Sequence, residues 1–284
     1  MSGEIIGIIG GSGLYEIDGL SDIKEIDIET PFGHPSASLI TGRLGEVEMV
    51  FLPRHGRGHT ILPAEVNFRA NIYALKQLGV QRILSVSAVG SMREKIKPGD
   101  MVIVDQFIDR TSGRPATFFG DGIVAHIPFA EPVCPELRQC FQASCQSLDI
   151  DYHSQGTYLC INGPQFSTRA ESNLYRQWNV DVIGMTNMPE ARLAREAQIC
   201  YATLALATDY DCWKEGNDDV SVEAVLEIIR QNIENAKWII REMALKISPL
   251  ASCSCAVALE NAILTQPDHI TAASREKLRV ILSS

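Results

Sequence analysis

The sequence predicts a single α/β domain in which a mostly parallel or mixed sheet is flanked by helices. Short apolar, β-branched runs alternate along the chain with longer stretches whose apolar residues recur at helical spacing. The chain has 284 residues, 45% of them hydrophobic, which is enough for one large core. No internal repeat or low-complexity linker divides it.

The first half of the chain is predicted to hold five strands and one helix. The first strand runs into a glycine turn, and the second and third are joined as a hairpin across Gly45. The helix begins at Pro63 and ends at Gly79, which matches the preference of helices for proline at the start and glycine at the end. The strands are expected at residues 4–9, 38–43, 46–52, 82–87 and 101–108, and the helix at residues 63–79.

The second half alternates more regularly. Residues 109–130 contain many glycines and prolines and are predicted to be a loop. Ser221 is the expected N-cap of a long amphipathic helix. The strands are expected at residues 156–161, 180–185 and 199–208, and the helices at residues 135–146, 167–178, 189–198 and 222–247.

The composition changes at Pro249, beyond the long helix. We therefore expect residues 1–248 to form the domain. Residues 249–284 are expected to form a C-terminal helical extension that packs on the same domain or on a neighbouring subunit.

Charge and hydropathy exclude several classes of partner. The net charge is −10, so duplex nucleic acid and anionic membrane are not expected partners. No apolar run approaches the length that spans a membrane, and the N-terminal residues lack the basic and apolar regions of a signal peptide. A cytoplasmic protein is expected.

The eight cysteines do not indicate a disulfide scaffold in a chain of this length. Most are expected to be buried, reduced thiols. Cys253 and Cys255 are too close in sequence for an ordinary zinc site, and no second pair of Cys or His lies near them in the sequence. A strained disulfide between the two remains open.

Several predicted strands end in small or polar residues. If these strands are parallel neighbours, their ends meet at one crevice, where ligands bind in open α/β sheets. Asp209 and Asp211 follow an apolar strand and point the same way if the extended backbone persists. Two close carboxylates raise at least one pKa. The alternative is that one caps the following helix and the other is solvated.

The glycine turn after the first strand, residues 10–13, is suited to binding an anion. Glycines allow backbone N–H groups to approach a phosphate, and Ser12 adds a hydroxyl. A dinucleotide-binding loop is disfavoured because Glu16 stands where its third glycine would be. A plain tight turn is the other alternative.

A basic loop follows the third predicted strand. Arg54 and His55 are expected to supply positive groups for an anion, and Arg54 can hold phosphate with two parallel hydrogen bonds. Arg57 and His59 are expected to satisfy loop carbonyls. A metal site at His55 and His59 is not expected, because no third ligand is near in the sequence.

Seven segments, in order, resemble the 5′-methylthioadenosine phosphorylases, a family within the trimeric purine nucleoside phosphorylases. The resemblance covers residues 4 to 248 and is specific because all the motifs occur together. They are GIIGGSGL from Gly7, TPFGHPS from Thr30, RHGRGH from Arg54, DRT from Asp109, GPQFSTRAES from Gly163, MTNMPE from Met185 and ATDYDCW from Ala207.

The resemblance implies a reaction in which phosphate attacks C1′ of methylthioadenosine and releases adenine and 5-methylthioribose 1-phosphate. It also implies a mixed, barrel-like sheet and a homotrimer with active sites near subunit interfaces. Inorganic phosphate is the co-substrate, and neither a cofactor nor a metal is expected.

The resemblance also implies the roles of individual residues. Asp209 and Asp211 are the catalytic pair, which hydrogen-bonds the purine at N7 and the 6-amino group. The other implied contacts fall into two groups by ligand. The phosphate contacts are Ser12, Arg54, His55, Ala88 and Thr186, and the nucleoside contacts are Phe166, Ser167, Met185, His126, Val220, Val222 and Leu226, with the adjacent subunit as one source of His126.

Three features depart from the family or extend it. Gln165 stands where the family usually has arginine, and Ser12 replaces a threonine common in relatives. The pair Cys253 and Cys255 is similar to a Cys-x-Cys feature of heat-stable relatives, which implies disulfides here, with Cys134 and Cys200 as one candidate pair.

Three other functions stay open from the sequence. A phosphorylase of 6-oxopurine nucleosides, acting on methylthioinosine or on inosine and guanosine, is the nearest. Two carboxylates favour a 6-amino base, because a 6-oxo base suits an amide at one position. A non-catalytic nucleoside-binding protein and an NAD-linked enzyme are the remaining alternatives.

Overall fold

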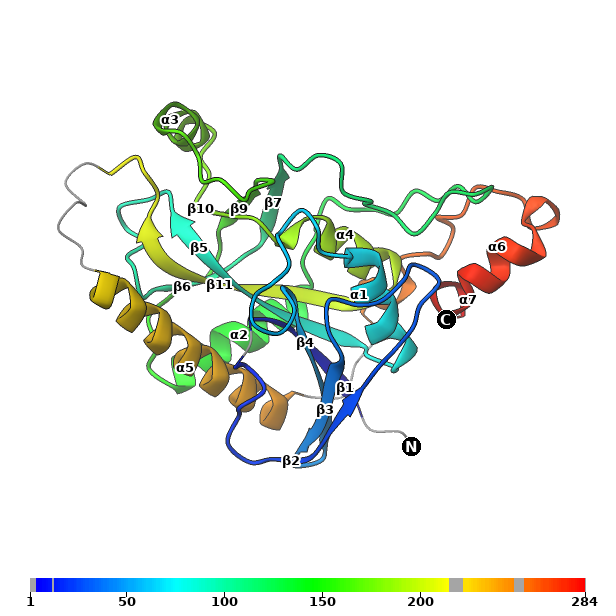
Figure 1. The fold of residues 1–284 in the computed structure, drawn as a ribbon, viewed down its shortest axis with the longest axis horizontal. Helices are drawn as coiled ribbons and strands as arrows, with labels where there is room; N and C mark the ends of the chain where they lie inside the picture. Colours follow the sequence, from blue (N-terminus) through cyan, green and yellow to red (C-terminus); the bar gives the residue numbers. More distant parts are fainter. Residues whose placement is uncertain (1–3, 12, 215–221, 248–252, 284) are drawn as a thin grey trace.

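The structure is a computed structural model and describes residues 4–11, 13–214, 222–247 and 253–283. One eleven-stranded mixed sheet forms the centre, and helices lie on both of its sides (Figure 1). The predicted fold class, a single α/β domain with a mixed sheet flanked by helices, is confirmed. No helix in these ranges combines the length and the hydropathy needed to cross a membrane.

The strands share one sheet and are numbered along the chain. They are β1 (Ile5–Gly10), β2 (Leu20–Ile26), β3 (Leu39–Leu44), β4 (Val47–Pro53), β5 (Arg82–Ser91), β6 (Met101–Ile103), β7 (Gln106–Asp109), β8 (Tyr152–His153), β9 (Thr157–Cys160), β10 (Val182–Gly184) and β11 (Cys200–Tyr210).

The helices are mostly amphipathic and follow the strands. They are α1 (Phe68–Gln77), α2 (Pro135–Ser147), α3 (Arg169–Gln177), α4 (Asn187–Glu196), α5 (Val222–Lys246), α6 (Ala272–Lys277) and α7 (Arg279–Leu282), with short 3-10 turns at Ser254–Val257 and Pro267–His269.

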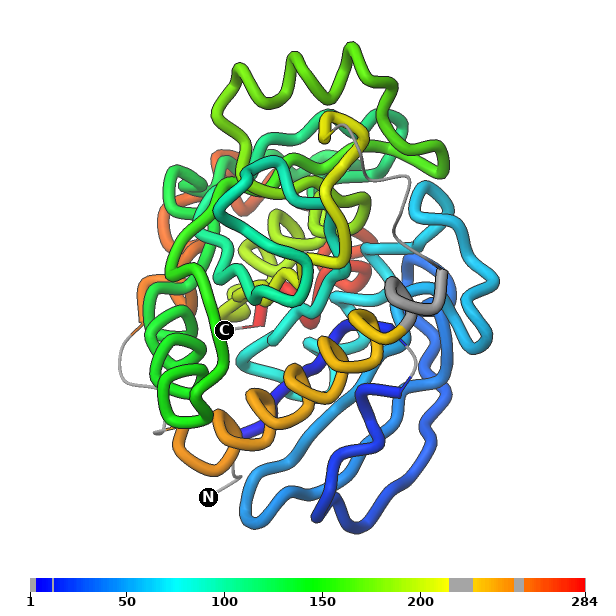
Figure 2. Tube along the Cα trace, turned by 90° about the vertical axis from the view of Figure 1, so that its left-hand side faces the viewer, coloured from blue at the N-terminus to red at the C-terminus, as the bar shows by residue number. Residues whose placement is uncertain are grey.

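β11 is buried on both faces because its side chains alternate between two cores. Tyr201 and Ala205 face the core that also contains α1 and α4, whereas Ala202 and Leu204 face the core that contains α2 and α5. Figure 2 shows α2 and α5 side by side over the second core. The continuous apolar run that predicted this strand is therefore explained by burial on both faces.

β5 is the central strand and has three partners. It pairs with β11 in parallel along its whole length. On its other edge, its first half pairs with β1 in parallel, and its last residues pair with β10 in the antiparallel sense. β1 is also parallel to β4. Four strands thus run in one direction, and their carboxyl ends lie at the same edge of the sheet.

The main differences between predicted and observed elements concern one helix and three strands. The helix expected from residue 63 begins at Phe68, because the Asn67 side chain caps it by accepting from the N–H of Ala70. The strand expected at 101–108 is two strands, β6 and β7, with different partners. β2 was not predicted, since its exposed face makes it polar.

The C-terminal segment packs on the domain. Leu278 and Ile281 join the core under α1, and Ala125 in the 109–130 loop forms a β-bridge with Ile263. Residues of the segment thus lie beside that loop, away from the arrowheads of β5 and β11 (Figure 1). The expected N-cap Ser221 lies outside the described residues.

Candidate active site

The carboxyl ends of β1, β4, β5 and β11 bring the predicted phosphate and purine residues to one edge of the sheet. β1 and β4 end level with each other, with Gly10 opposite Pro53. The N–H of Arg54, directly after β4, donates to the Gly10 carbonyl at 2.9 Å. The glycine turn and the basic loop are therefore neighbours, as predicted from their positions after parallel strands.

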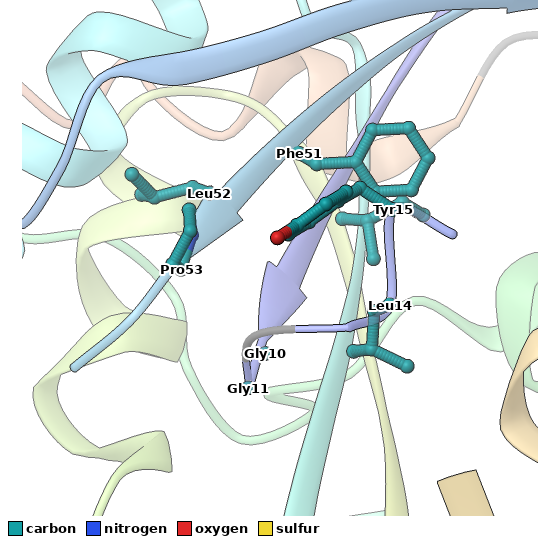
Figure 3. Close-up of a pocket in the computed structure, with 8 residues that line it drawn as sticks. Gly10, Gly11, Leu14, Tyr15, Phe51, Leu52 and Pro53 are labelled. Carbon is teal, nitrogen blue, oxygen red and sulfur yellow. The ribbon is translucent and has the colours of Figure 1, made fainter. Parts of the chain in front are cut away.

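A small pocket lies beside the glycine turn (Figure 3). The rings of Tyr15 and Phe51 lie on one side of it, and Leu52 and Pro53 on the other. No charged side chain lines this pocket. It is therefore part of the packing beneath the turn. Ser12 lies outside the described residues.

Arg54 is almost completely buried, at 2% exposure, and holds the site together. Its guanidinium donates to both carboxylate oxygens of Glu190, at 2.7 and 3.1 Å. Nη2 also donates to Ser85 Oγ at 2.7 Å. Nη1 has two hydrogens and donates to the Val86 carbonyl at 3.0 Å. One Nη1 hydrogen has no further acceptor among the described residues, so Arg54 retains a donor for an anion.

His55 is neutral at physiological pH. Its Nδ1 lies 2.9 Å from the Ile61 carbonyl, so Nδ1 carries the hydrogen and Nε2 is an acceptor. Burial, with a smaller contribution from the nearby Arg54 charge, lowers the pKa of His55 to about 4, although the hydrogen bond with the Ile61 carbonyl acts in the opposite direction. The His59 ring stacks on His55 with centroids 4.4 Å apart. His55 is therefore neutral rather than the positive group that the sequence predicted, and its Nε2 can only accept a hydrogen bond.

Ala88 and Thr186 supply the next part of the site. Ala88 lies in the middle of the otherwise buried β5, and it is exposed. Thr186 is the residue before α4, and its hydroxyl lies 3.0 Å from Ser87 Oγ. The backbone of α4 is extended at Met188, so Thr186 contributes its hydroxyl and its own backbone rather than a regular helix N-terminus. These positions fit the predicted phosphate contacts.

The segment from Met185 to Met188 is held by a buried arginine. Arg114 donates from Nη1 to the carbonyls of Met185 and Met188, at 2.8 and 2.7 Å, and from Nη2 to the carbonyl of Asn162 at 2.9 Å. Gly163, at a φ of +64°, lies against Met185, because a Cβ there would come within 2.4 Å of Met185 Sδ. Arg114 therefore fixes the residue predicted to lie under the ribose.

Asp209 and Asp211 lie on the same side of β11. The register of β11 with β5 shifts at Thr208, and both aspartates then flank Gly90. A Cβ on Gly90 would lie 3.3 Å from Asp209 Oδ1 and 3.4 Å from the Cβ of Asp211. The prediction that the two side chains share one direction agrees with this geometry, although a bulge in the strand precedes them.

The two carboxylates differ in environment. Asp209 is exposed to solvent, but protein atoms lie close around its carboxyl group. The resulting desolvation raises the pKa of Asp209 above its ordinary value. The negative Asp211 raises it further, whereas the hydroxyl of Thr208, which donates at 2.7 Å, lowers it. Asp211 is 8% exposed, and within the described part of the chain its Oδ2 has no donor.

Ser167 lies close to the aspartate pair. Cys212, next to Asp211, donates its thiol to the Ser167 carbonyl at 3.3 Å. The buried Ser167 Oγ also has no partner in the described part of the chain. Phe166, by contrast, is 83% exposed. Buried polar atoms without partners are costly, so Ser167 Oγ and Asp211 Oδ2 are both available to hydrogen-bond a polar ligand or water.

Of the remaining predicted residues, the structure describes the side chain of His126 alone, and it does not bring His126 to this edge. His126 is exposed, and its N–H donates to the Ala262 carbonyl in the C-terminal segment. Within this chain it lies apart from the aspartates. Val220 lies outside the described residues. Val222 and Leu226 belong to α5, but their side chains lie outside the described part.

Sequence reasoning missed two residues that organise the site, Glu190 and Arg114. Glu190 lies 136 residues from Arg54 in the sequence, and Arg114 lies 71 residues from Met185. Glu190 is the last residue of the motif MTNMPE. A carboxylate partner for the buried Arg54 could have been sought in that motif. Arg114 lies in the loop 109–130, which offered no signal.

Comparison with known proteins identifies the family. The profile of the phosphorylase superfamily matches residues 5–244. The S-methyl-5′-thioadenosine phosphorylases of Geobacter sulfurreducens and Thermosynechococcus vestitus are 60% and 55% identical, over 99% and 98% of this chain and the same shares of theirs.

Solved structures agree with this result. A methylthioadenosine phosphorylase from an Antarctic soil metagenomic library has a TM-score of 0.95 at 49% identity, covering 99% of this chain and 100% of that one. The Schistosoma mansoni methylthioadenosine phosphorylase in complex with adenine has a TM-score of 0.79 at 40% identity, covering 86% and 92%. The chain therefore belongs to the phosphorylase superfamily and, within it, to the S-methyl-5′-thioadenosine phosphorylases.

Proposed function

We propose that the chain catalyses the phosphorolysis of 5′-methylthioadenosine to adenine and 5-methylthioribose 1-phosphate. The observation that carries the proposal is the pair Asp209 and Asp211, placed at the same sheet edge as the anion-binding groups around Arg54 and Thr186. The names of relatives that match over the full chain support this substrate.

Asp209 acts on the leaving base. In the reaction, a phosphate oxygen forms a bond to C1′, the C1′–N9 bond breaks, and its electron pair moves into the purine. A carboxyl whose pKa is raised can hold a proton and donate it toward N7 as this charge develops. Such general-acid catalysis typically contributes about 10²–10⁴-fold.

Asp211 and Ser167 recognise the edge of the base. The unpartnered Asp211 Oδ2 is an acceptor for a 6-amino group, and Ser167 Oγ can donate to a ring nitrogen or accept from an amine. A 6-oxopurine would place an acceptor against the Asp211 carboxylate. Methylthioinosine, inosine and guanosine are therefore the poorer substrates.

Phosphate is the nucleophile and also the counter-charge to the sugar. The phosphate site is formed by the Nη1 hydrogen of Arg54, the neutral His55 ring, the backbone at Ala88 and Thr186 at the start of α4, with Ser12 as a further contact. As the C1′–N9 bond lengthens, positive charge grows on the ribose over Met185, and the phosphate stabilises it. No metal or other cofactor takes part in this step.

The 5′-methylthio pocket is assigned to Val220, Val222, Leu226 and His126. Because His126 lies apart from the aspartates in its own chain, we propose that it reaches the site of a neighbouring subunit in a cytoplasmic homotrimer. The exposed Phe166 ring fits the same arrangement, since a neighbour would cover it.

A complementation experiment tests the shared site. His126→Ala and Asp209→Asn subunits are co-expressed and the mixed oligomers are purified. Sites that combine a native His126 with a native Asp209 from different subunits should recover activity above either homomeric variant. No recovery in confirmed mixed oligomers would contradict the arrangement, while leaving the reaction itself untouched.

A substrate panel tests the reaction. Methylthioadenosine, adenosine, methylthioinosine and inosine are compared by kcat/KM at saturating phosphate. Methylthioadenosine is expected to exceed adenosine by about 10–200-fold, the range that an apolar pocket supplies. A higher kcat/KM for methylthioinosine than for methylthioadenosine would overturn the assignment of Asp211.

A further inference from the structure

Four cysteines from three distant segments meet in one buried cluster. Cys134 is the N-cap of α2, and Cys200 is the first residue of β11. Cys253 and Cys255 come from the C-terminal segment. All four side chains are buried, and their Sγ atoms lie within 4.8 Å of one another. The sequence offered no second ligand pair near Cys253 and Cys255, but the fold supplies one.

All eight cysteines are free thiols in the structure. The disulfide between Cys134 and Cys200 that the family resemblance implied is therefore not formed, although the two residues are neighbours in the cluster. The separation between Cys134 Sγ and Cys253 Sγ is 3.7 Å. Four sulfurs at about 2.3 Å from a tetrahedral Zn²⁺ lie about 3.8 Å from each other, which matches this separation.

The cluster is anchored as a ligand set requires. The N–H of Cys134 donates to the Tyr201 carbonyl at 2.8 Å, and the N–H of Cys200 donates to the Gln81 carbonyl at 3.0 Å. These two backbone hydrogen bonds hold Cys134 and Cys200 in place, as outer contacts do for metal ligands.

The surroundings favour a closed site. The four cysteines belong to the apolar core between the sheet and α2 and α5. Arg195 is near enough to Cys255 for its positive charge to act on the thiol, and a tetrathiolate site with Zn²⁺ carries two net negative charges. Burial together with four protein ligands leaves no position for a substrate.

We propose that Cys134, Cys200, Cys253 and Cys255 bind one Zn²⁺ ion as a structural tetrathiolate site. Four thiolates in tetrahedral positions select Zn²⁺ or iron over Mg²⁺, Ca²⁺ and Mn²⁺, and Zn²⁺ has no redox chemistry that would damage a core. The zinc replaces four thiol protons and joins the C-terminal segment to the start of β11.

The site would have an effect beyond its own neighbourhood. Cys255 lies a few residues before Ala262 and Ile263, which hold the backbone of His126 and Ala125. Zinc at the cluster would therefore fix the C-terminal segment on which the His126 loop rests. Its loss is expected to lower thermal stability without touching Asp209 or Arg54.

Metal analysis of the purified full chain tests the proposal. Protein expressed with added zinc is expected to hold about one Zn²⁺ per chain, and after denaturation with a chelator and no reductant it should titrate as eight free thiols. Cys253→Ser should lose the zinc, whereas Cys140→Ser, outside the cluster, should keep it. Less than about 0.2 zinc per chain with only four to six free thiols would overturn the proposal in favour of disulfides.

Cobalt substitution keeps the test decisive if Cys253→Ser does not fold. The unaltered chain, refolded with Co²⁺, should show the sulfur-to-cobalt charge-transfer band and the visible bands of a tetrahedral tetrathiolate site. Iron in place of zinc in the purified protein, or an octahedral cobalt spectrum, would contradict the assignment. Neither result depends on phosphorolysis being the reaction.

Discussion

Asp209 combines a raised pKa with a position beside Gly90 at the end of β11. Asp209→Asn keeps the shape of the side chain but removes the carboxyl proton. We predict that it lowers kcat on methylthioadenosine by at least about ten-fold, a lower bound set beneath the roughly 10²–10⁴-fold that a general acid typically contributes. KM should change much less. Steady-state kinetics at saturating phosphate measure both, and near-normal kcat would remove Asp209 from the acid role.

The neighbouring Asp211 charge is one cause of the raised pKa of Asp209. Asp209 is active when protonated, so turnover should fall as the pH rises through its pKa. Removing the Asp211 charge lowers that pKa, because the ionised form of Asp209 no longer faces a like charge. Asp211→Asn should therefore move the alkaline fall of kcat to lower pH. A profile that stays in place, or moves upward, would contradict this coupling.

Arg54 has two roles that one substitution separates. In Arg54→Ala, Glu190 keeps a buried charge without its partner, which is expected to destabilise the fold by about 3–5 kcal/mol. The folded fraction of the Arg54→Ala protein should also have a much higher KM for phosphate. Urea unfolding and the phosphate KM measure the two effects. Arg57→Ala, in an exposed pair with Glu25, is the control and should change stability by no more than about 1 kcal/mol.

An unchanged phosphate KM in folded Arg54→Ala protein would refute the phosphate contact and leave only a structural role. The sequence predicted a basic phosphate loop but gave no sign of Glu190, 136 residues away. Both residues stand in quoted motifs. Their pairing depends on β4 and α4 meeting across the sheet, which local sequence does not encode.

At the scale of elements, β5 and β11 position the catalytic pair. Gly90 in β5 is tightly surrounded, because a Cβ there would lie 3.2 Å from Ile183 Cγ2 and 3.3 and 3.4 Å from the two aspartates, so that these neighbours would have to shift. We predict that Gly90→Ala displaces Asp209 by a few tenths of an ångström and lowers kcat on the order of ten-fold.

Gly90→Ala should change the free energy of unfolding by less than about 2 kcal/mol, since only side chains must shift. Kinetics and urea unfolding on the same preparation separate the two effects. A large loss of stability with normal kcat in the folded protein would show that Gly90 serves packing rather than the position of the aspartates.

Most elements were predicted from hydrophobic pattern, and their ends were set by capping. β11 was predicted correctly because burial on both faces leaves a continuous apolar run. α3 begins two residues later than expected, because Thr168 and Glu171 form a capping box. The strand expected at 101–108 is divided because β6 and β7 pair with different strands, which periodicity does not reveal.

At the scale of the molecule, the fold brings together groups that are far apart in sequence. The convergence of strand ends was predictable from polar residues after apolar runs. The four-cysteine cluster was not, since its ligands come from α2, β11 and the C-terminal segment. His126 shows the same limit in another form, because its distance from Asp209 within one chain depends on the path of the 109–130 loop.

The central claim is that one chain joins phosphate chemistry at Arg54 and Thr186 to purine chemistry at Asp209 and Asp211. The most direct measurement incubates the purified protein with methylthioadenosine, with and without phosphate, and identifies both products. We predict adenine and 5-methylthioribose 1-phosphate in equal amounts, only when phosphate is present. Adenine released at the same rate without phosphate, or binding without release of adenine, would contradict the account.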